Sequence, residues 1–303
     1  MMKTYNIFET LDSLKVKYEA RGNLKKNVFS NLKAINNADS NSLVFIGEER
    51  NNKEELSKHT KSGIIITNQE IEITDSSLSN KCFIIVENPR LVVTRIGNLL
   101  FRKKVKYDIH STSVISKEAN ISKNVYVGPF CSIKNCTIEE GTVIHENCHI
   151  DDNVKIGKNV IIHPGCVIGT EAVGHIKNEN NVYENFPQLG GVIIEDGVEI
   201  FPNAKVFRGA LSDTIIQSNS IIDTHVIVGH NVKIGSNTII TARTVIGGST
   251  IIGDNVWISL GSVLSDNIKI SNNVHIGPGA VVIKDIPEGA KVVSKPAFIL
   301  PNN

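Results

Sequence analysis

An aliphatic residue returns at every sixth position of the chain from Ile216 to Val282. On an α-helix six residues turn through about 600°, so these side chains would spread over several faces. In an extended chain residues i and i+6 share one face, and the Gly, Asn or Asp residues between them break the strand. The period therefore predicts short strands with regular corners, stacked as a parallel β-helix with the aliphatic residues inward. The remaining positions of the series are Ile222, Val228, Ile234, Ile240, Ile246, Ile252, Ile258, Leu264, Ile270 and Ile276.

The same step occurs earlier in the chain. It extends from Ile115 to Ile168, with a slip of one residue near Cys136. Residues 169–191 and 208–214 interrupt the period. Because excursions from a solenoid coil leave it as loops that commonly build a binding face, we expect both segments to lie outside the stack.

Residues 1–104 lack this period. The segments SLVFIG, SGIIIT and KCFIIVEN are typical of strands, and PRLVVTRIGNLLFRK has apolar residues at helical spacing behind Pro89. We therefore expect a mainly β protein in which a small α/β domain (1–104) precedes a β-helix (105–290). A short carboxy-terminal tail (291–303) follows.

The charge balance excludes several classes of partner. The chain has 32 basic and 31 acidic residues, so no strong field draws it to nucleic acid or to an anionic membrane. No apolar run reaches the roughly 18 residues of a membrane span, and the start lacks a signal peptide, so we expect a cytoplasmic protein. The five cysteines are odd in number and form no CxxC, which argues against a disulfide framework or a zinc ribbon.

Longer motifs carry a resemblance to a known family. The hexad resembles that of the hexapeptide-repeat acyltransferases, which implies a left-handed β-helix and a homotrimer. The segments FPQLGGVIIEDGVEI, RGALSDTII, VGHNVKIGSNT and IGGSTIIGDN, with NSLVFIG and ENPRLVVTRIGNLLF nearer the start, resemble the UDP-3-O-acylglucosamine N-acyltransferases of lipid A biosynthesis. The resemblance implies no bound cofactor, and a nucleotide sugar and an acyl thioester as substrates.

The motif VGHN places His230 among polar turn residues. In the family this histidine is the general base, and imidazole is suited to taking a proton from an amine near neutral pH. With three hexads in each coil, the residue one coil after His230 is Gly248, whose backbone N–H the resemblance implies as the oxyanion donor. We therefore predict His230 and Gly248 as the catalytic pair.

Four further residues are candidates for binding. Phe45 stands where the family stacks uracil, which predicts a nucleotide-sugar site in the first domain, with an ordinary core role beside Val44 and Ile46 as the alternative. Asp223 and His225 precede His230 and are candidates for binding the substrate. A solvated turn is an equal alternative for Asp223, and it is the favoured role for His225, which faces elsewhere on the coil. Lys284 is a candidate for the phosphates of the acyl donor, with simple solubility as the alternative.

Some features depart from the lipid A enzymes. Asn267 stands where the family has a second histidine, and the chain ends without the helices associated with acyl carrier protein. The end, GPGAVVIKDIPEGAKVVSKPA, instead resembles sugar N-acetyltransferases that use acetyl-CoA. We therefore expect an N-acyltransferase for a nucleotide-linked amino sugar of surface polysaccharide or lipid A, with a short acyl-CoA ahead of acyl carrier protein as donor. The alternative is UDP-3-O-(3-hydroxyacyl)glucosamine N-acyltransferase with acyl carrier protein.

Two alternatives belong to other classes of protein. The γ-type carbonic anhydrases use the same helix with three histidines on zinc, and His225 with His230 has a fitting spacing. Residues 189–191, about two coils upstream, offer no third histidine, so we expect no metal site. A non-catalytic β-helix scaffold is the other alternative, and the placement of His230 argues against it.

Overall fold

The computed structural model describes residues 3–69, 80–103 and 105–295. The chain divides into two compact units, residues 1–104 and 105–303, which are described in turn. Residues 296–303 of the expected tail lie outside the described residues.

The first unit is a small α/β domain. A five-stranded sheet has the order β2-β7-β6-β5-β4, in which β2 is antiparallel to β7 and the other neighbours are parallel. The strands expected from SLVFIG, SGIIIT and KCFIIVEN are confirmed as β5, β6 and β7. The elements are β1 (Tyr5–Asn6), α1 (Ile7–Ser13), β2 (Glu19–Gly22), β3 (Val28–Phe29), β4 (Asn31–Leu32), η1 (Ile35–Asn37), β5 (Ser42–Phe45), α2 (Lys53–His59), β6 (Ile64–Thr67), β7 (Cys82–Ile85) and α4 (Pro89–Leu100).

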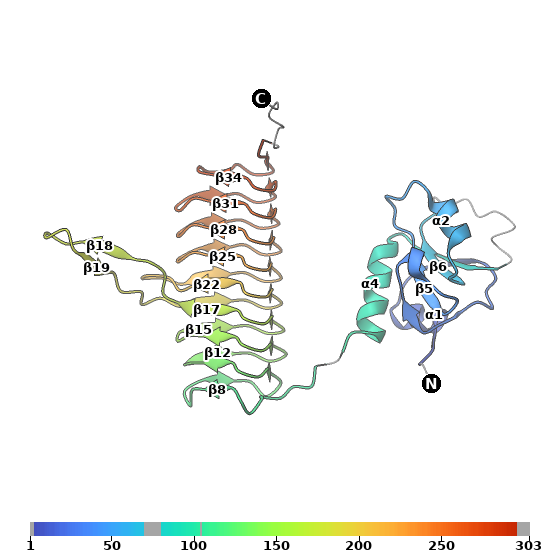
Figure 1. The fold of residues 1–303 in the computed structure, drawn as a ribbon, viewed down its shortest axis with the longest axis horizontal. Helices are drawn as coiled ribbons and strands as arrows, with labels where there is room; N and C mark the ends of the chain where they lie inside the picture. Colours follow the sequence, from blue (N-terminus) through green and yellow to red (C-terminus); the bar gives the residue numbers. More distant parts are fainter. Residues whose placement is uncertain (1–2, 70–79, 104, 296–303) are drawn as a thin grey trace, which may run out of the picture. The chain divides into compact units, whose positions relative to one another are not determined.

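Helices cover both faces of this sheet (Figure 1). Helices α1 and α4 pack buried residues such as Leu11 and Ile96 on one face, and α2 packs Leu56 on the other. Helix α4 begins as its sequence predicts, because the side chain of Asn88 accepts the Leu91 amide ahead of Pro89. Because β4, β5, β6 and β7 are parallel, their carboxyl ends lie at one edge of the sheet.

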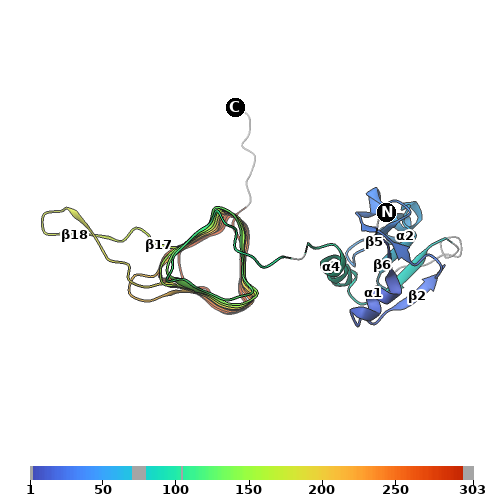
Figure 2. The same cartoon turned by 90° about the horizontal axis from the view of Figure 1, so that it is seen from below.

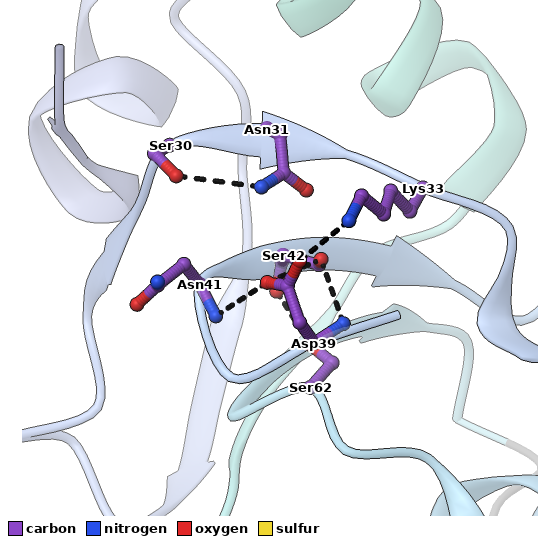
Figure 3. Close-up of polar contacts among 7 residues, drawn as sticks. All are labelled: Ser30, Asn31, Lys33, Asp39, Asn41, Ser42 and Ser62. Atoms are coloured by element: carbon purple, nitrogen blue, oxygen red, sulfur yellow. Dashed lines mark hydrogen bonds and ion pairs between the residues drawn. The ribbon is translucent and has the colours of Figure 1, made fainter. Parts of the chain in front are cut away.

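A polar turn leads into β5 (Figure 3). One oxygen of Asp39 accepts the amide of Asn41 and the hydroxyl of Ser42, and the other pairs with Lys33. These contacts, with Lys33 the largest cause, lower the pKa of Asp39 to about 2. The carboxylate therefore closes this turn in its charged form.

The second unit is a parallel β-helix of three sheets, and its outline is triangular along the axis (Figure 2). The first sheet contains β8 (Val114–Ile115), β11 (Ser132–Ile133), β14 (His149–Ile150), β17 (Val167–Thr170), β22 (Lys205–Phe207), β25 (Ile227–Val228), β28 (Val245–Ile246), β31 (Val263–Leu264) and β34 (Val281–Val282). The second contains β9 (Asn120–Ile121), β12 (Cys136–Ile138), β15 (Val154–Ile156), β20 (Val192–Ile194), β23 (Thr214–Ile216), β26 (Lys233–Ile234), β29 (Ile251–Ile252) and β32 (Lys269–Ile270). The third contains β10 (Tyr126–Val127), β13 (Val143–Ile144), β16 (Ile161–Ile162), β21 (Glu199–Ile200), β24 (Ile221–Ile222), β27 (Ile239–Ile240), β30 (Trp257–Ile258), β33 (His275–Ile276) and β35 (Lys291–Val292).

The hexad positions form the core that the sequence predicts. Ile222, Ile240 and Ile258 lie in register in successive coils, and each is fully buried. Burying one such side chain stabilises the fold by about 1.5–3 kcal/mol. At the corners the recurring Asn residues, such as Asn237 with φ 54°, adopt the left-handed conformation that Asn tolerates better than most residues.

Buried hydroxyls and thiols tie successive coils together. Thr238 donates its hydroxyl to the carbonyl of Gly253 and accepts the amide of Val256. Cys148 takes a similar place, with Sγ 3.2 Å from the carbonyl of His163. The contact with Cys131 lowers the pKa of Cys148, but the contact with Cys166 and burial raise it further, and the pKa rises to about 12. These cysteines are core residues with a hydrogen-bonding role that their size alone did not predict.

The irregularities expected from the sequence are also confirmed. The step from Ile133 in β11 to Ile138 in β12 is one residue short of the hexad. The first interruption forms an antiparallel hairpin, β18 (His175–Lys177) with β19 (Tyr183–Asn185), which projects from the stack (Figure 1). The second interruption follows β22 and returns to the stack at β23.

Candidate active site

His230 and Gly248 lie at the same corner of successive coils. Val228 pairs with Ile246, so the residues two positions further on, His230 and Gly248, are stacked. A Cβ added at Gly248 would stand 2.5 Å from Nε2 of His230 and 2.8 Å from Cε1. The imidazole therefore lies over Gly248 in space that only glycine leaves open.

The amide of Gly248 differs from those on either side of it. The Gly247 amide donates to the carbonyl of Leu264 (2.9 Å), and the Ser249 amide donates to the carbonyl of His230 (2.8 Å). Within the described part of the chain, the N–H of Gly248 donates to no protein acceptor. A fixed, unpaired N–H beside an imidazole is the pair of groups that acyl transfer requires, a donor for the oxyanion and a base for the nucleophile.

Asn231 holds the other side of the imidazole. Nδ1 of His230 lies 3.0 Å from Oδ1 of Asn231. The amide nitrogen of Asn231 in turn donates to the carbonyl (2.9 Å) and the hydroxyl (2.8 Å) of Ser212. Sequence reasoning missed Asn231, because an Asn recurs at many corners of the helix and this one has the same left-handed φ, 60°.

The column of His230 and Gly248 continues through charged residues. Ile246 pairs with Leu264 in the next coil, and Leu264 pairs with Val282 in the coil after that. Asp266 therefore follows Gly248, and Lys284 follows Asp266. A hydrogen bond from the Ser265 hydroxyl is the largest cause that lowers the pKa of Asp266, and the charge of His230 contributes less. Lys284 is exposed at the end of this column, in reach of solvent.

Asp223 and His225 lie at a different corner, before β25, whereas His230 follows that strand. Both oxygens of Asp223 accept backbone amides, one from Thr224 (2.6 Å) and one from Ala242 (3.0 Å) in the next coil. His225 is exposed, with Nδ1 2.9 Å from the hydroxyl of Thr224. Within one chain the fold does not bring either residue to His230.

Comparisons with known proteins find similarity to acyltransferases. Residues 135–170 match the family described as bacterial transferase hexapeptide (six repeats). The chain is 28% identical over 252 residues to the UDP-3-O-acylglucosamine N-acyltransferase of Hydrogenovibrio crunogenus, which covers 77% of this chain and 70% of the relative. It is 29% identical over 259 residues to the protein of that name from Coxiella burnetii, which covers 76% of this chain and 71% of the relative. The chain is an acyltransferase that carries the hexapeptide repeat.

A solved structure supports the fold of this acyltransferase. The UDP-N-acetylglucosamine acyltransferase of Francisella novicida matches with a TM-score of 0.50 and 28% identity, over 62% of this chain and 67% of that one. The fold class expected from the sequence, a left-handed parallel β-helix preceded by a small α/β domain, is confirmed. The expected acyltransferase class is confirmed as well.

The described residues contain no group of three or more His, Cys, Asp or Glu side chains arranged to hold a metal ion. His225 and His230, whose spacing suggested such a site, belong to different corners of the coil. Among the same residues, no helix has the length and apolar character that a membrane crossing needs.

A second candidate site lies in the α/β unit. A cavity of about 440 Å³ opens at the carboxyl edge of the parallel strands and is lined by Phe45, Arg50, Asn88 and Arg90 among others. Ligands of parallel α/β sheets commonly bind at this edge. Phe45 is half-buried and contacts the core on one side, so it is both a core residue and a wall of the cavity.

Two histidines of the β-helix outside the His230 column, His145 and His163, contact neighbouring coils. Nε2 of His163 lies 2.9 Å from Oε1 of Glu199, and its ring stacks on Phe201 with the centroids 4.6 Å apart. His145 stacks on His163 from the preceding coil at 5.2 Å. This aromatic column joins coils across the first interruption of the hexad.

Proposed function

We propose that this acyltransferase moves an acyl group from a thioester to the amine of a UDP-linked amino sugar, as a UDP-3-O-acylglucosamine N-acyltransferase. The observation that carries the proposal is the stacked pair of His230 and the free amide of Gly248. The names of the relatives in Hydrogenovibrio and Coxiella support this acceptor, and they favour the lipid A alternative over the short-chain transfer we placed first. The donor, coenzyme A or acyl carrier protein, is left to experiment.

The chemistry follows from the positions of the two groups. Nε2 of His230 takes a proton as the sugar amine attacks the thioester carbonyl and the C–N bond forms. The N–H of Gly248 stabilises the negative charge on the carbonyl oxygen. The C–S bond then breaks, and the leaving thiolate receives the proton from the imidazolium. The products are an amide and a free thiol, and His230 returns to its neutral form.

We place the nucleotide in the cavity of the α/β unit. The ring of Phe45 offers a face for a pyrimidine, and Arg50 and Arg90 at the same cavity could pair with the two phosphates. Glu48 and Glu49 also line the cavity and balance the charge of the two arginines, so we expect the phosphates to bind by direct pairing with Arg50 and Arg90 and not through a net positive field.

We further propose that the active form is a homotrimer in which neighbouring β-helices contact each other. The outward residues Val245, Val263 and Val281 lie in register on the first sheet and are 36%, 43% and 71% exposed. A larger apolar surface than solvent favours is typical of a face that a second copy covers. Asp223, His225 and Lys284 are candidates for contacts with substrate or donor in clefts between the copies.

One set of assays tests this function. Purified protein is incubated with UDP-3-O-acylglucosamine, or with UDP-N-acetylglucosamine as a control that lacks a free amine. Each is paired with acyl-CoA or acyl-carrier-protein donors of several chain lengths. We expect amide formation only with the free amine, and none with His230→Ala. Acylation of a hydroxyl on the control sugar at an equal rate would contradict N-acyl transfer.

A further inference from the structure

The second interruption of the hexad, residues 208–214, lies against the corner that carries His230. Its hydrogen bonds with that corner go to one residue, Asn231. Ala210 donates its amide to Oδ1 of Asn231 at 3.0 Å, and Ser212 receives both hydrogens of the Asn231 side-chain nitrogen. The backbone N–H of Asn231 donates to the hydroxyl of Thr214 at 2.9 Å.

These partners settle which way the Asn231 amide faces. The backbone carbonyl of Ser212 can only accept, so the atom 2.9 Å from it must be the nitrogen of Asn231. The backbone N–H of Ala210 can only donate, so the atom 3.0 Å from it must be the oxygen. One partner can only accept and the other can only donate, and both give the same orientation of the Asn231 amide.

The fixed oxygen of Asn231 determines the tautomer of His230. Oδ1 lies 3.0 Å from Nδ1 of the imidazole and can only accept, so Nδ1 must carry the hydrogen in the neutral ring. Nε2 then has the free lone pair. Nε2 is also the ring nitrogen that lies over Gly248, where the acyl carbonyl would sit.

Further hydrogen bonds, from the end of the first interruption, hold the loop 208–214 in place. The amide of Leu189 donates to the carbonyl of Ala210 (2.6 Å), and the amide of Gly191 donates to Asp213 (2.7 Å). A side chain at Gly209 would collide with the carbonyl of Ser212, so only glycine lets the loop close on Asn231. The end of the first interruption thus supports the second.

We propose that Asn231, locked by the loop 208–214, is a positioning residue that keeps the proton of His230 on Nδ1 and presents Nε2 as the base. The inference rests on the proposed role of His230, and it assigns to the loop a place in the catalytic apparatus. The loop, which interrupts the hexad, supplies the partners that hold the Asn231 amide.

Asn231→Gly removes the side chain of Asn231. Glycine is chosen because Asn231 has φ 60°, a conformation that glycine adopts without strain. Asn237→Gly is the matched control, because Asn237 has φ 54° at another corner. We expect Asn231→Gly to lower kcat by about 10- to 100-fold with little change in KM, because a ring that can flip or rotate spends less time aimed at the amine. Asn237→Gly should keep the wild-type kcat.

Asn231→Asp tests the acceptor itself. A carboxylate keeps an oxygen for Nδ1–H but has no hydrogen to donate to the Ser212 carbonyl, so this variant should recover part of the activity that Asn231→Gly loses. Because its charge favours the imidazolium, the rise of kcat with pH should move to higher pH. The other charged groups near His230 are Asp213 of the loop, and Asp266 and Lys284 of the column, and all are unchanged in these variants.

Nitrogen-15 NMR of protein labelled at histidine gives a readout that does not depend on turnover. With His230→Ala used to assign the signal, the wild type should show a protonated Nδ1 and a bare Nε2 at His230. Asn231→Gly should show a mixture of tautomers. The opposite tautomer in the wild type, or unchanged kcat and pH profile in Asn231→Gly, would overturn the inference. If His230→Ala itself remained active, the proposed function would fail instead.

Discussion

Nε2 of His230 lies 2.5 Å from the point where a side chain at Gly248 would begin. The two residues are 18 positions apart in the sequence and in direct register between adjacent coils. The contact places a base and a free backbone N–H on the same side of one corner. Because a side chain at position 248 would collide with the imidazole, His230 can take its position only if residue 248 is glycine. Substitutions at either residue test this relationship.

Removing the imidazole should abolish most of the activity and leave the fold intact. His230→Ala is expected to lower kcat by roughly 10²- to 10⁴-fold, because the amine then loses its base. The melting temperature should stay near that of the wild type, since His230 lies at a half-buried corner outside the hydrophobic core. Higher pH should restore part of the rate as bulk base deprotonates the sugar ammonium. Steady-state kinetics and calorimetry measure both, and near wild-type turnover would contradict the assignment.

Adding a side chain under the imidazole should act through His230. Gly248 is not among the glycines with positive φ, so Gly248→Ala meets little backbone strain, but its Cβ would push the ring away. We expect a lower kcat, and a larger loss for Gly248→Val. The double variant with His230→Ala should be no slower than His230→Ala alone, because the collision no longer matters. Additive losses would show that Gly248 acts independently of the ring.

Phe45→Leu should weaken the binding of the sugar nucleotide. Leucine keeps the apolar contact with the core but removes the ring face at the cavity, so the KM for the UDP-sugar should rise several-fold. The KM for the acyl donor should stay unchanged. A destabilised protein with an unchanged KM for the UDP-sugar would mean that Phe45 serves only the core.

A charge inside the β-helix should unfold it locally. Ile240 is fully buried between Ile222 and Ile258, so Ile240→Asp should lower the free energy of unfolding by about 4 kcal/mol or more. Lys233→Asp is the control, because Lys233 points outward and is exposed. Chemical denaturation measures both variants. Equal stability of the two would mean that the inward positions are assigned wrongly.

The turn at Asp39 should make the α/β unit sensitive to acid. Its pKa is lowered to about 2, so its contribution to stability is complete above the ordinary value near 3.8 and is lost as the pH falls toward 2. Asp39→Asn should therefore melt at a lower temperature than the wild type at pH 6. The difference should shrink between pH 4 and pH 2 in calorimetric scans. A difference that stays constant over this range would contradict the ion pair with Lys33.

The periodic part of this protein could be predicted from its sequence. Because each coil of three hexads returns to the same place after 18 residues, the spacing alone placed Gly248 beneath His230 and Ile240 between Ile222 and Ile258. In the structure, β25 separates Asp223 and His225 from His230. An inward aliphatic at every sixth residue leaves the chain no other packed arrangement, so local pattern and tertiary fold agree.

The tertiary structure alone decided what the interruptions do. The loop 208–214 has no period, so no arithmetic places Ser212 beside Asn231, 19 residues away, or Leu189 beside Ala210. The contact of His163 with Glu199 spans 36 residues across the projecting hairpin for the same reason. A repeat fixes the positions of backbone and core because it repeats their environment at every coil. The direction of a polar side chain depends instead on partners that a non-repeating loop supplies, and the proton on His230 is set by such partners.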